Sequence, residues 1–226
     1  MKKNNTFKRL LGKTKGSTRL LGKHKLQALQ ENVLSQNRQN QMSNKDRMYA
    51  HFAKQAYEHN KGIKEHTLFG YELVDDLSGE HHVVYTNKDK KHSIIAYKGT
   101  DPSQWQDIKS DMYIATGTEY NSPRFKNALY DYNSVKDKLN TPITVVGHSL
   151  GGAVANYVSD QTGAQSVTFN PGAGLGDLIQ NRNSDRKRII RTKYDPVSYL
   201  ATLKQEGVVE AKQHKFDPHT IDNFTK

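Results

Sequence analysis

The chain has 226 residues, enough for one sizeable α/β core with an appendage, and its composition is that of a polar globular protein. It contains no cysteine, which excludes a disulfide framework, a thiolate nucleophile and a cysteine metal site. The net charge of +11 is unevenly distributed, because residues 1–25 hold nine basic residues and no acidic one, so the basic character belongs to a tail.

The amino-terminal tail repeats a cationic unit with two leucines, since RLLGKTK at 9–15 returns as RLLGKHK at 19–25. Two copies are too few to form a core. We interpret the tail as an arm for an anionic surface, either an acidic membrane or the phosphate backbone of nucleic acid. A disordered solubilising extension and a transit peptide are open alternatives. We assign 1–42 to this extension and its linker, and 43–226 to a catalytic domain.

The sequence contains no run that approaches the length of a transmembrane helix. Its amino terminus also lacks the apolar stretch and the cleavage site of a secretory signal. We therefore expect a protein that is not conventionally secreted, and a cytoplasmic or particle-packaged location is favoured over other compartments.

The first element predicted in the catalytic domain is a helix that begins after Ser43 and runs to about Glu58. The sequence Ser-Asn-Lys-Asp at its start is typical of a capping box. Met48, Phe52 and Ala56 recur at helical spacing, which predicts one buried face.

Alternating hydrophobic runs at 71–74 and 82–85, separated by a turn sequence, indicate two strands. A third strand is predicted at the start of 93–101, where the run ends in a glycine. A short helix is expected at 107–111, and a strongly amphipathic helix is predicted over 123–139.

The next element joins a β-branched strand to a small-residue helix over 141–158, with GHSLG at 147–151 at the turn. This G-x-S-x-G pattern is typical of a nucleophile elbow, in which a tight turn lifts the hydroxyl of Ser149 clear of the backbone. We expect Gly147 and Gly151 to stand where neighbouring backbone leaves no room for a Cβ. The pattern alone is weak, but the strand-turn-helix context favours the functional interpretation over a glycine-rich turn.

Two further strands are predicted at 165–169 and 188–192, each after a helical or loop segment. Strands that alternate with helices predict an α/β fold with a mostly parallel central sheet covered by helices on both faces.

A serine hydroxyl is a poor nucleophile at neutral pH, so Ser149 needs a histidine base and a carboxylate that orients it. In enzymes that carry this elbow, the chain order is serine, acid, histidine. The histidines after Ser149 are His214 and His219. The candidate acids ahead of them are Asp160, Asp177, Asp185 and Asp195. Asp195 is favoured because it follows a predicted strand, where parallel sheets keep their ligands.

From about Ser43 to its end, the chain resembles the class 3 lipases, the fungal-type lipase branch of the α/β-hydrolase superfamily. The nucleophile motif GHSLGG of that family stands unaltered at 147–152. The family's strand-ending R-G-S/T segment is matched by KGT at 98–100, with lysine in place of arginine. Its spaced aspartates are matched by Asp107 and Asp111, and its segment after the elbow is echoed, with a different glycine content, at 168–177.

Two motifs near the carboxyl terminus complete the resemblance. The acid-bearing D-x-V is matched at 195–197, and the terminal H-S-L-x-N-Y/F is matched at 219–224. The resemblance therefore implies Asp195 as the acid and His219 as the base. It also implies that the backbone N–H groups of Thr100 and Leu150 hold the oxyanion. The implied activity is that of a serine esterase or lipase that requires neither a metal nor an organic cofactor.

The segment between Thr100 and Pro123 bears on the substrate. A triglyceride lipase normally has a sizeable apolar lid, whereas the large apolar residues of this segment are interrupted by charges. These residues are Trp105, Ile108, Met112, Tyr113, Ile114 and Tyr120. A short, polar cover favours a phospholipid or lysophospholipid as the ester substrate, while an acylglycerol stays open.

Two rival interpretations remain. One is an inactive hydrolase-like scaffold whose basic arm binds nucleic acid, against which the full set of triad residues argues. The other is acyl transfer or peptide hydrolysis at the same site, because the triad does not choose the acceptor.

Overall fold

The computed structural model describes residues 41–100, 122–172, 185–195, 197–198 and 208–226. Several predictions concern residues outside these ranges. They are the cationic tail and linker, the polar cover with its short helix at 107–111, and the candidate acid Asp177.

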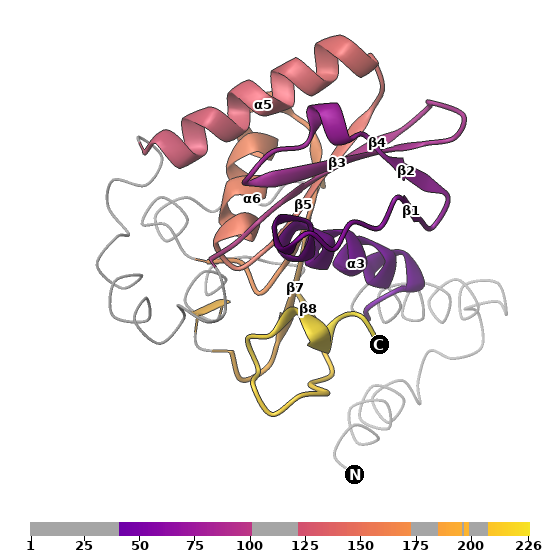
Figure 1. Ribbon diagram of the computed structural model, residues 1–226. Helices are drawn as coiled ribbons and strands as arrows, with labels where there is room; N and C mark the ends of the chain where they lie inside the picture. The colour runs from indigo at the N-terminus through magenta and orange to yellow at the C-terminus, as the bar shows by residue number, and fades with distance from the viewer. Residues whose placement is uncertain (1–40, 101–121, 173–184, 196, 199–207) are drawn as a thin grey trace, which may run out of the picture. The chain divides into compact units, whose positions relative to one another are not determined.

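Three α-helices and eight strands are defined within the described residues (Figure 1). The helices are α3 (Asn44–Glu58), α5 (Pro123–Leu139) and α6 (Leu150–Thr162). The strands are β1 (Thr67–Leu68), β2 (Tyr71–Leu73), β3 (His82–Asn87), β4 (Ser93–Tyr97), β5 (Ile143–His148), β6 (Gln165–Phe169), β7 (Lys187–Thr192) and β8 (Val209–Ala211). Short 3₁₀ helices are η1 (His59–Lys61), η2 (Asp75–Leu77) and η5 (Ile221–Asn223).

The strands form one mixed sheet in the order β1-β2-β3-β4-β5-β6-β7-β8. Strands β4 to β8 pair in parallel, as predicted, but β1 to β4 pair antiparallel. The predicted mostly parallel sheet thus describes only the carboxyl-terminal half. Its amino-terminal half joins successive strands by connections too short for a crossover, and such connections force neighbouring strands to run antiparallel.

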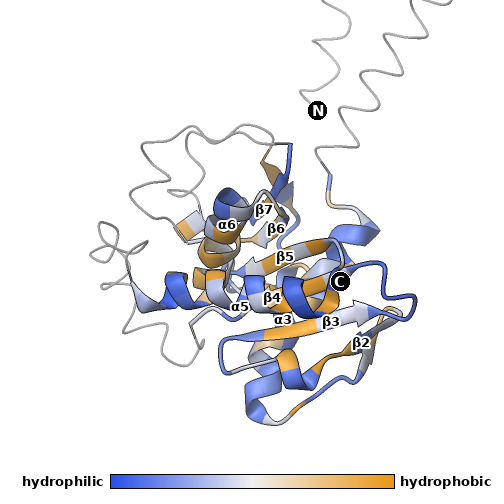
Figure 2. Cartoon of the chain, turned by 90° about the horizontal axis from the view of Figure 1, so that it is seen from above, coloured by the Kyte–Doolittle hydropathy of each residue, from blue (hydrophilic) through white to orange (hydrophobic). Residues whose placement is uncertain are grey.

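Helices cover both faces of the sheet, as the alternation of elements predicted. Helix α3 packs on one face, and α5 and α6 pack on the other (Figure 1). Strand β4 illustrates why, since Ile94 and Ala96 join the core beneath α3 while Ile95 and Tyr97 join the core beneath α5 and α6. Figure 2 shows hydrophobic residues concentrated on the central strands.

The start of α3 is fixed by the predicted capping box. Ser43 Oγ accepts from the backbone N–H of Asp46 at 3.1 Å, and the Asp46 carboxylate accepts from Ser43 N at 2.6 Å. Arg188 of β7 donates to the same carboxylate at 2.6 Å. The cap therefore also ties α3 to the parallel half of the sheet.

Helix α5 has the bounds that its amphipathic pattern predicted. It begins with Pro123, whose missing N–H costs nothing in the first turn, and it ends before Asn140, which adopts the left-handed conformation with φ 48°. No helix in the described part of the chain is both long and apolar enough to span a lipid bilayer.

Candidate active site

The candidate residues follow parallel strands at one edge of the sheet. Thr100 follows β4, Ser149 follows β5, Asp195 follows β7, and His219 lies on the segment after β8. Because the carboxyl ends of parallel strands meet at the same edge, residues far apart in sequence come together there.

The elbow places Ser149 in a strained backbone conformation between β5 and α6, with φ 57° and ψ −127°. Neighbouring backbone holds it in this state. Ser149 N donates to Phe169 O of β6 at 3.1 Å, and Gly152 N donates to Ser149 O at 2.9 Å. The turn is therefore supported by the adjacent strand and by the first turn of α6.

The glycines of the elbow are required by close backbone approach, which confirms their predicted steric role. A Cβ on Gly147 would lie 2.1 Å from Gly151 O, and a Cβ on Gly151 would lie 2.1 Å from Tyr97 O. Both contacts are with backbone, which has little room to move. Any larger residue at either position would push the elbow away from β4 or α6.

Asp195 and His219 form a buried pair. His219 Nδ1 lies 2.9 Å from Asp195 Oδ1, and the carboxylate is completely buried. Burial alone would raise the pKa of Asp195, but hydrogen bonds from His219 and Ser198 outweigh it and hold the pKa below the ordinary value of the carboxyl. The aspartate therefore stays ionised at neutral pH, and it accepts a hydrogen bond from the Nδ1–H of His219.

The backbone around His219 is held by the nearby Asp217 side chain and by side chains at the ends of β5, β6 and β7. His219 N donates to Asp217 Oδ1 at 2.9 Å, and the Nε2 of His148 lies 2.5 Å from His219 O. One residue earlier, Pro218 O accepts from Asn170 Nδ2 at 2.8 Å and from Thr192 Oγ1 at 2.6 Å. The ends of β5, β6 and β7 thus fix the position of the candidate base.

The tautomer of His148 follows from its neighbours. Burial and the nearby His219 lower the pKa of His148 to about 3, so the imidazole is neutral. A carbonyl can only accept, so the proton is on Nε2, which donates to His219 O. The other nitrogen, Nδ1, is then an acceptor for the hydroxyl of Tyr57 on α3 at 3.0 Å.

The sequence interpretation did not assign roles to His148, Tyr57 or Asn170. The alternation of β5 carried a partial signal, because Gly147 faces α6 and the next residue must therefore face α3. No comparable signal identified Tyr57, which lies 91 positions from His148 in the chain.

Ser149 is brought to the same edge but is not bonded to the pair. Its Oγ is buried and makes no hydrogen bond with any residue in the described ranges. A direct Ser149–His219 hydrogen bond is therefore not formed in this structure. In unliganded active sites such bonds are often long or poorly aligned and tighten when substrate binds.

The segment before Thr100 lies against the elbow. A Cβ on the preceding Gly99 would come within 2.6 Å of His148 O and 2.2 Å of the Tyr57 hydroxyl. Within the described part of the chain, no acceptor is bonded to the backbone N–H of Thr100 or Leu150.

The competing candidates are placed elsewhere. His214 is exposed, and its backbone N–H donates to Asn223 Oδ1 at 2.7 Å. Asp160 pairs with Lys187 at 2.6 Å, and Asp185 is exposed. Asp160 thus contacts a lysine of β7, whereas Asp195 contacts a histidine.

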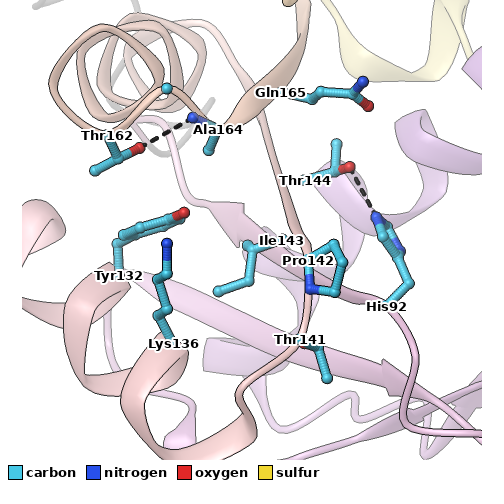
Figure 3. Close-up of a pocket in the computed structure, with 11 residues that line it drawn as sticks. His92, Tyr132, Lys136, Thr141, Pro142, Ile143, Thr144, Thr162, Ala164 and Gln165 are labelled. Carbon is cyan, nitrogen blue, oxygen red and sulfur yellow. Dashed lines mark hydrogen bonds between the residues drawn. The ribbon is translucent and has the colours of Figure 1, made fainter.

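A cavity of about 370 Å³ lies at the opposite edge of the sheet. Figure 3 shows it beside Ile143, the first residue of β5, with Lys136 and Tyr132 of α5 on its rim. The six residues of β5 separate it from Ser149 by roughly 20 Å. The cavity is therefore distinct from the serine site. Among the described residues, no group of three His, Asp or Glu side chains is arranged to hold a metal ion.

Two comparisons with known proteins agree on the kind of chemistry. Residues 71–197 match a family model described as phospholipase-like, a Tle-like phospholipase domain. An extracellular phospholipase A1 from Serratia liquefaciens is 36% identical over 110 residues, which is 49% of this chain and 32% of that protein. The match with this relative therefore spans about a third of the relative's length.

Proposed function

We propose that this chain, which belongs to the phospholipase-like family, hydrolyses carboxylic ester bonds of phospholipids with Ser149 as the nucleophile. The model of that family, a Tle-like phospholipase domain, matches more than half of the chain. The observation that carries the proposal is the buried Asp195–His219 pair, 2.9 Å apart, at the edge where the elbow presents Ser149.

In the proposed reaction, Ser149 Oγ attacks the ester carbonyl while His219 Nε2 takes its proton. The proton on Nδ1 of His219 faces Asp195, so Nε2 carries the lone pair that a base requires. The ionised Asp195 stabilises the imidazolium that forms. His219 then gives the proton to the leaving alcohol, and water hydrolyses the acyl-enzyme by the same path in reverse.

The negative charge on the carbonyl oxygen needs donors that are already in place. We assign this role to the backbone N–H groups of Thr100 and Leu150, supported by their lack of described acceptors and by the position of Gly99 against the elbow. Removing one such donor typically slows a reaction by about 10²–10³-fold. The side chains of these two residues are not required for the role.

Before attack, the Ser149 hydroxyl must turn toward His219, because Ser149 Oγ makes no hydrogen bond with any described residue. The Cα–Cβ bond of Ser149 has three staggered states, and rotation about it redirects the hydroxyl. Substrate binding would select the productive one.

A phospholipid substrate is favoured over a triglyceride by the family match, by the similarity to the Serratia phospholipase A1 and by the short polar cover predicted from sequence. The finer resemblance to class 3 lipases stays a prediction, as does action on acylglycerols. Acyl transfer would use the same acyl-enzyme with a different acceptor. The comparisons lend no support to an inactive scaffold or to binding of nucleic acid.

The proposal is tested with a panel of fluorogenic phospholipids, a triglyceride analogue and a soluble short-chain ester, hydrolysed by wild type and by Ser149→Ala. We expect phospholipid hydrolysis by wild type and a loss of at least roughly 10³-fold in the variant. Hydrolysis that survives the substitution would refute the assignment of the nucleophile. If only the triglyceride analogue were hydrolysed, the assignment of a phospholipid as the substrate would be refuted.

A further inference from the structure

The turn that carries the proposed base exposes a large hydrophobic side chain. Phe216 lies three positions before His219 and is 103% exposed, so its ring contacts essentially nothing. Tyr194, directly before Asp195, is 70% exposed. In the sequence, each aromatic residue therefore lies within three positions of one member of the buried Asp195–His219 pair.

The turn around Phe216 is held by hydrogen bonds that do not involve the ring. The buried Asn223 side chain accepts from His214 N and Lys215 N, both at 2.7 Å, and donates to Asp217 O at 2.9 Å. Gln213 Nε2 donates to Phe216 O at 3.0 Å. The ring thus projects from a braced turn and contributes no packing to the fold.

The charges near these two rings are mainly positive. Strands β7 and β8 pair in parallel with Thr192 opposite Ala211, so Lys193 and Lys212 follow them at the same edge of the sheet. Both lysines are exposed, as is Lys215 beside Phe216. Lys193 Nζ lies 5.6 Å from the centre of the Tyr194 ring.

The acidic groups at this edge are outnumbered by the exposed lysines. Asp195 is buried against His219, whereas Asp217 is exposed beside Phe216 and its carboxylate accepts the backbone N–H of His219. Glu210 pairs with Arg191 at 3.1 Å. Among the described residues, the two exposed aromatic side chains therefore share this edge with three exposed lysines and the exposed Asp217.

We propose, resting on the proposed function, that Phe216 and Tyr194 with Lys193, Lys212 and Lys215 form a docking surface for an anionic phospholipid bilayer. Phe216 inserts among the acyl chains, Tyr194 lies at the headgroup level, and the lysines bind the lipid phosphates. Aromatic side chains bind at the boundary between headgroups and acyl chains, and lysines are attracted to anionic headgroups.

The position of the surface favours a bilayer over a partner protein. Figure 1 shows the segment after β8, drawn in yellow, running from the sheet edge to the carboxyl terminus. The same turn carries Phe216 and His219, so insertion of the ring brings the base to the surface in which the ester bond lies. A protein bound here would instead compete with the substrate.

A fluorescent label tests insertion directly, because the chain has no cysteine and a single one can be labelled without background. Phe216→Cys and the control Tyr130→Cys, both in the Ser149→Ala protein, are labelled with a polarity-sensitive dye. Tyr130 is 74% exposed and lies on α5, which carries none of the surface. Vesicles of phosphatidylcholine and phosphatidylglycerol are added at about 0.1 M salt, where the Debye length is about 10 Å and exposed lysines can still bind lipid phosphates. Docking by the cationic tail alone would leave the label at 216 in water.

We expect a blue shift for the label at 216 and none for the label at 130. Vesicle sedimentation then measures affinity for Phe216→Ser, Tyr194→Ser and Tyr130→Ser in the Ser149→Ala protein. Phe216→Ser should weaken binding about tenfold, Tyr194→Ser should weaken it less, and Tyr130→Ser should leave it unchanged. Thermal unfolding checks that each variant keeps the fold.

The proposal is overturned if the protein sediments with vesicles while the label at 216 stays in water, or if the Phe216→Ser, Tyr194→Ser double variant binds as well as its parent. Absence of vesicle binding overturns it equally. None of these results affects the serine assignment, which depends on whether Ser149→Ala abolishes hydrolysis of a soluble ester.

Discussion

The Nε2–H of His148 donates a hydrogen bond of 2.5 Å to the backbone carbonyl of His219, across 71 positions of the chain. The residue before the proposed nucleophile thereby fixes the backbone of the proposed base. The Tyr57 hydroxyl, 3.0 Å from Nδ1, holds the imidazole from the side of α3. Elbow and base are thus coupled through one neutral histidine.

His148→Leu should lower kcat on a soluble ester by about 10–100-fold, because His219 O loses its donor and the base is no longer held against Asp195. The KM should change little, since His148 does not face the substrate in this account. His148→Gln should recover most of the activity, because its amide N–H reaches about as far as Nε2. Steady-state kinetics of the two variants, with the NMR signal of the His219 Nδ1–H proton, measure the effect. Equal losses in both would mean that ring volume, not the hydrogen bond, is what matters.

The same residue should make the protein sensitive to acid. The folded pKa of His148 is about 3 and its ordinary value is 6.5, so below pH 6.5 the unfolded state binds the proton and the folded state does not. Stability from this residue is therefore fully present above pH 6.5 and is lost as the pH falls toward 3.

Urea unfolding at pH 7 and pH 5 tests this. Between these values wild type should lose on the order of 2 kcal/mol more stability than His148→Gln, which has no titrating group at this position. Other buried histidines remain in both proteins and cancel in the comparison. An identical pH dependence in the two proteins would contradict burial of a neutral His148.

His219→Ala should lower hydrolysis of a soluble ester by at least roughly 10³-fold, as Ser149→Ala does, because members of a triad act as a unit. His214→Ala should remain near wild type, since that side chain is exposed. Steady-state kinetics of the three variants on the soluble ester identify which histidine is the base. Equal losses at both histidines would leave His219 without a special role, and a loss at His214 alone would reverse the assignment.

Asp195→Asn should cost less than Ser149→Ala but still slow the reaction strongly, because nucleophile and base remain while the tautomer of His219 is no longer imposed. Asp177→Asn is the matched comparison, as one of the other carboxylates that sequence order allowed. If Asp177→Asn were damaging and Asp195→Asn silent, the acid would have been misassigned despite its contact with His219.

The features that sequence predicted best are the local ones. The capping box at Ser43, the bounds of α5 and the strand-turn-helix of the elbow each depend on residues within a few positions of one another. Their signals are therefore complete in a short window. The same holds for the glycine positions of the elbow, whose steric role the structure confirms.

The features that sequence missed depend on distant contacts. Strands β1 and β8 have two and three residues, too few for a periodic signal, and they exist because a neighbouring strand pairs with them. The antiparallel half of the sheet follows from the short connections between β2, β3 and β4, of which the sequence predicted only the first as a turn. The contact of Tyr57 with His148 had no local signal, and neither did the exposure of Phe216 within a charged segment.

Covalent labelling with a fluorophosphonate tests most directly whether Ser149 is an activated nucleophile. Such a probe reacts with a serine whose proton is taken by a neighbouring base, and peptide mass spectrometry locates the adduct. We predict one adduct on Ser149 in wild type, none in Ser149→Ala, and labelling slowed by roughly 10³-fold in His219→Ala. An unlabelled wild-type protein, or labelling at an unchanged rate in His219→Ala, would contradict the proposed triad.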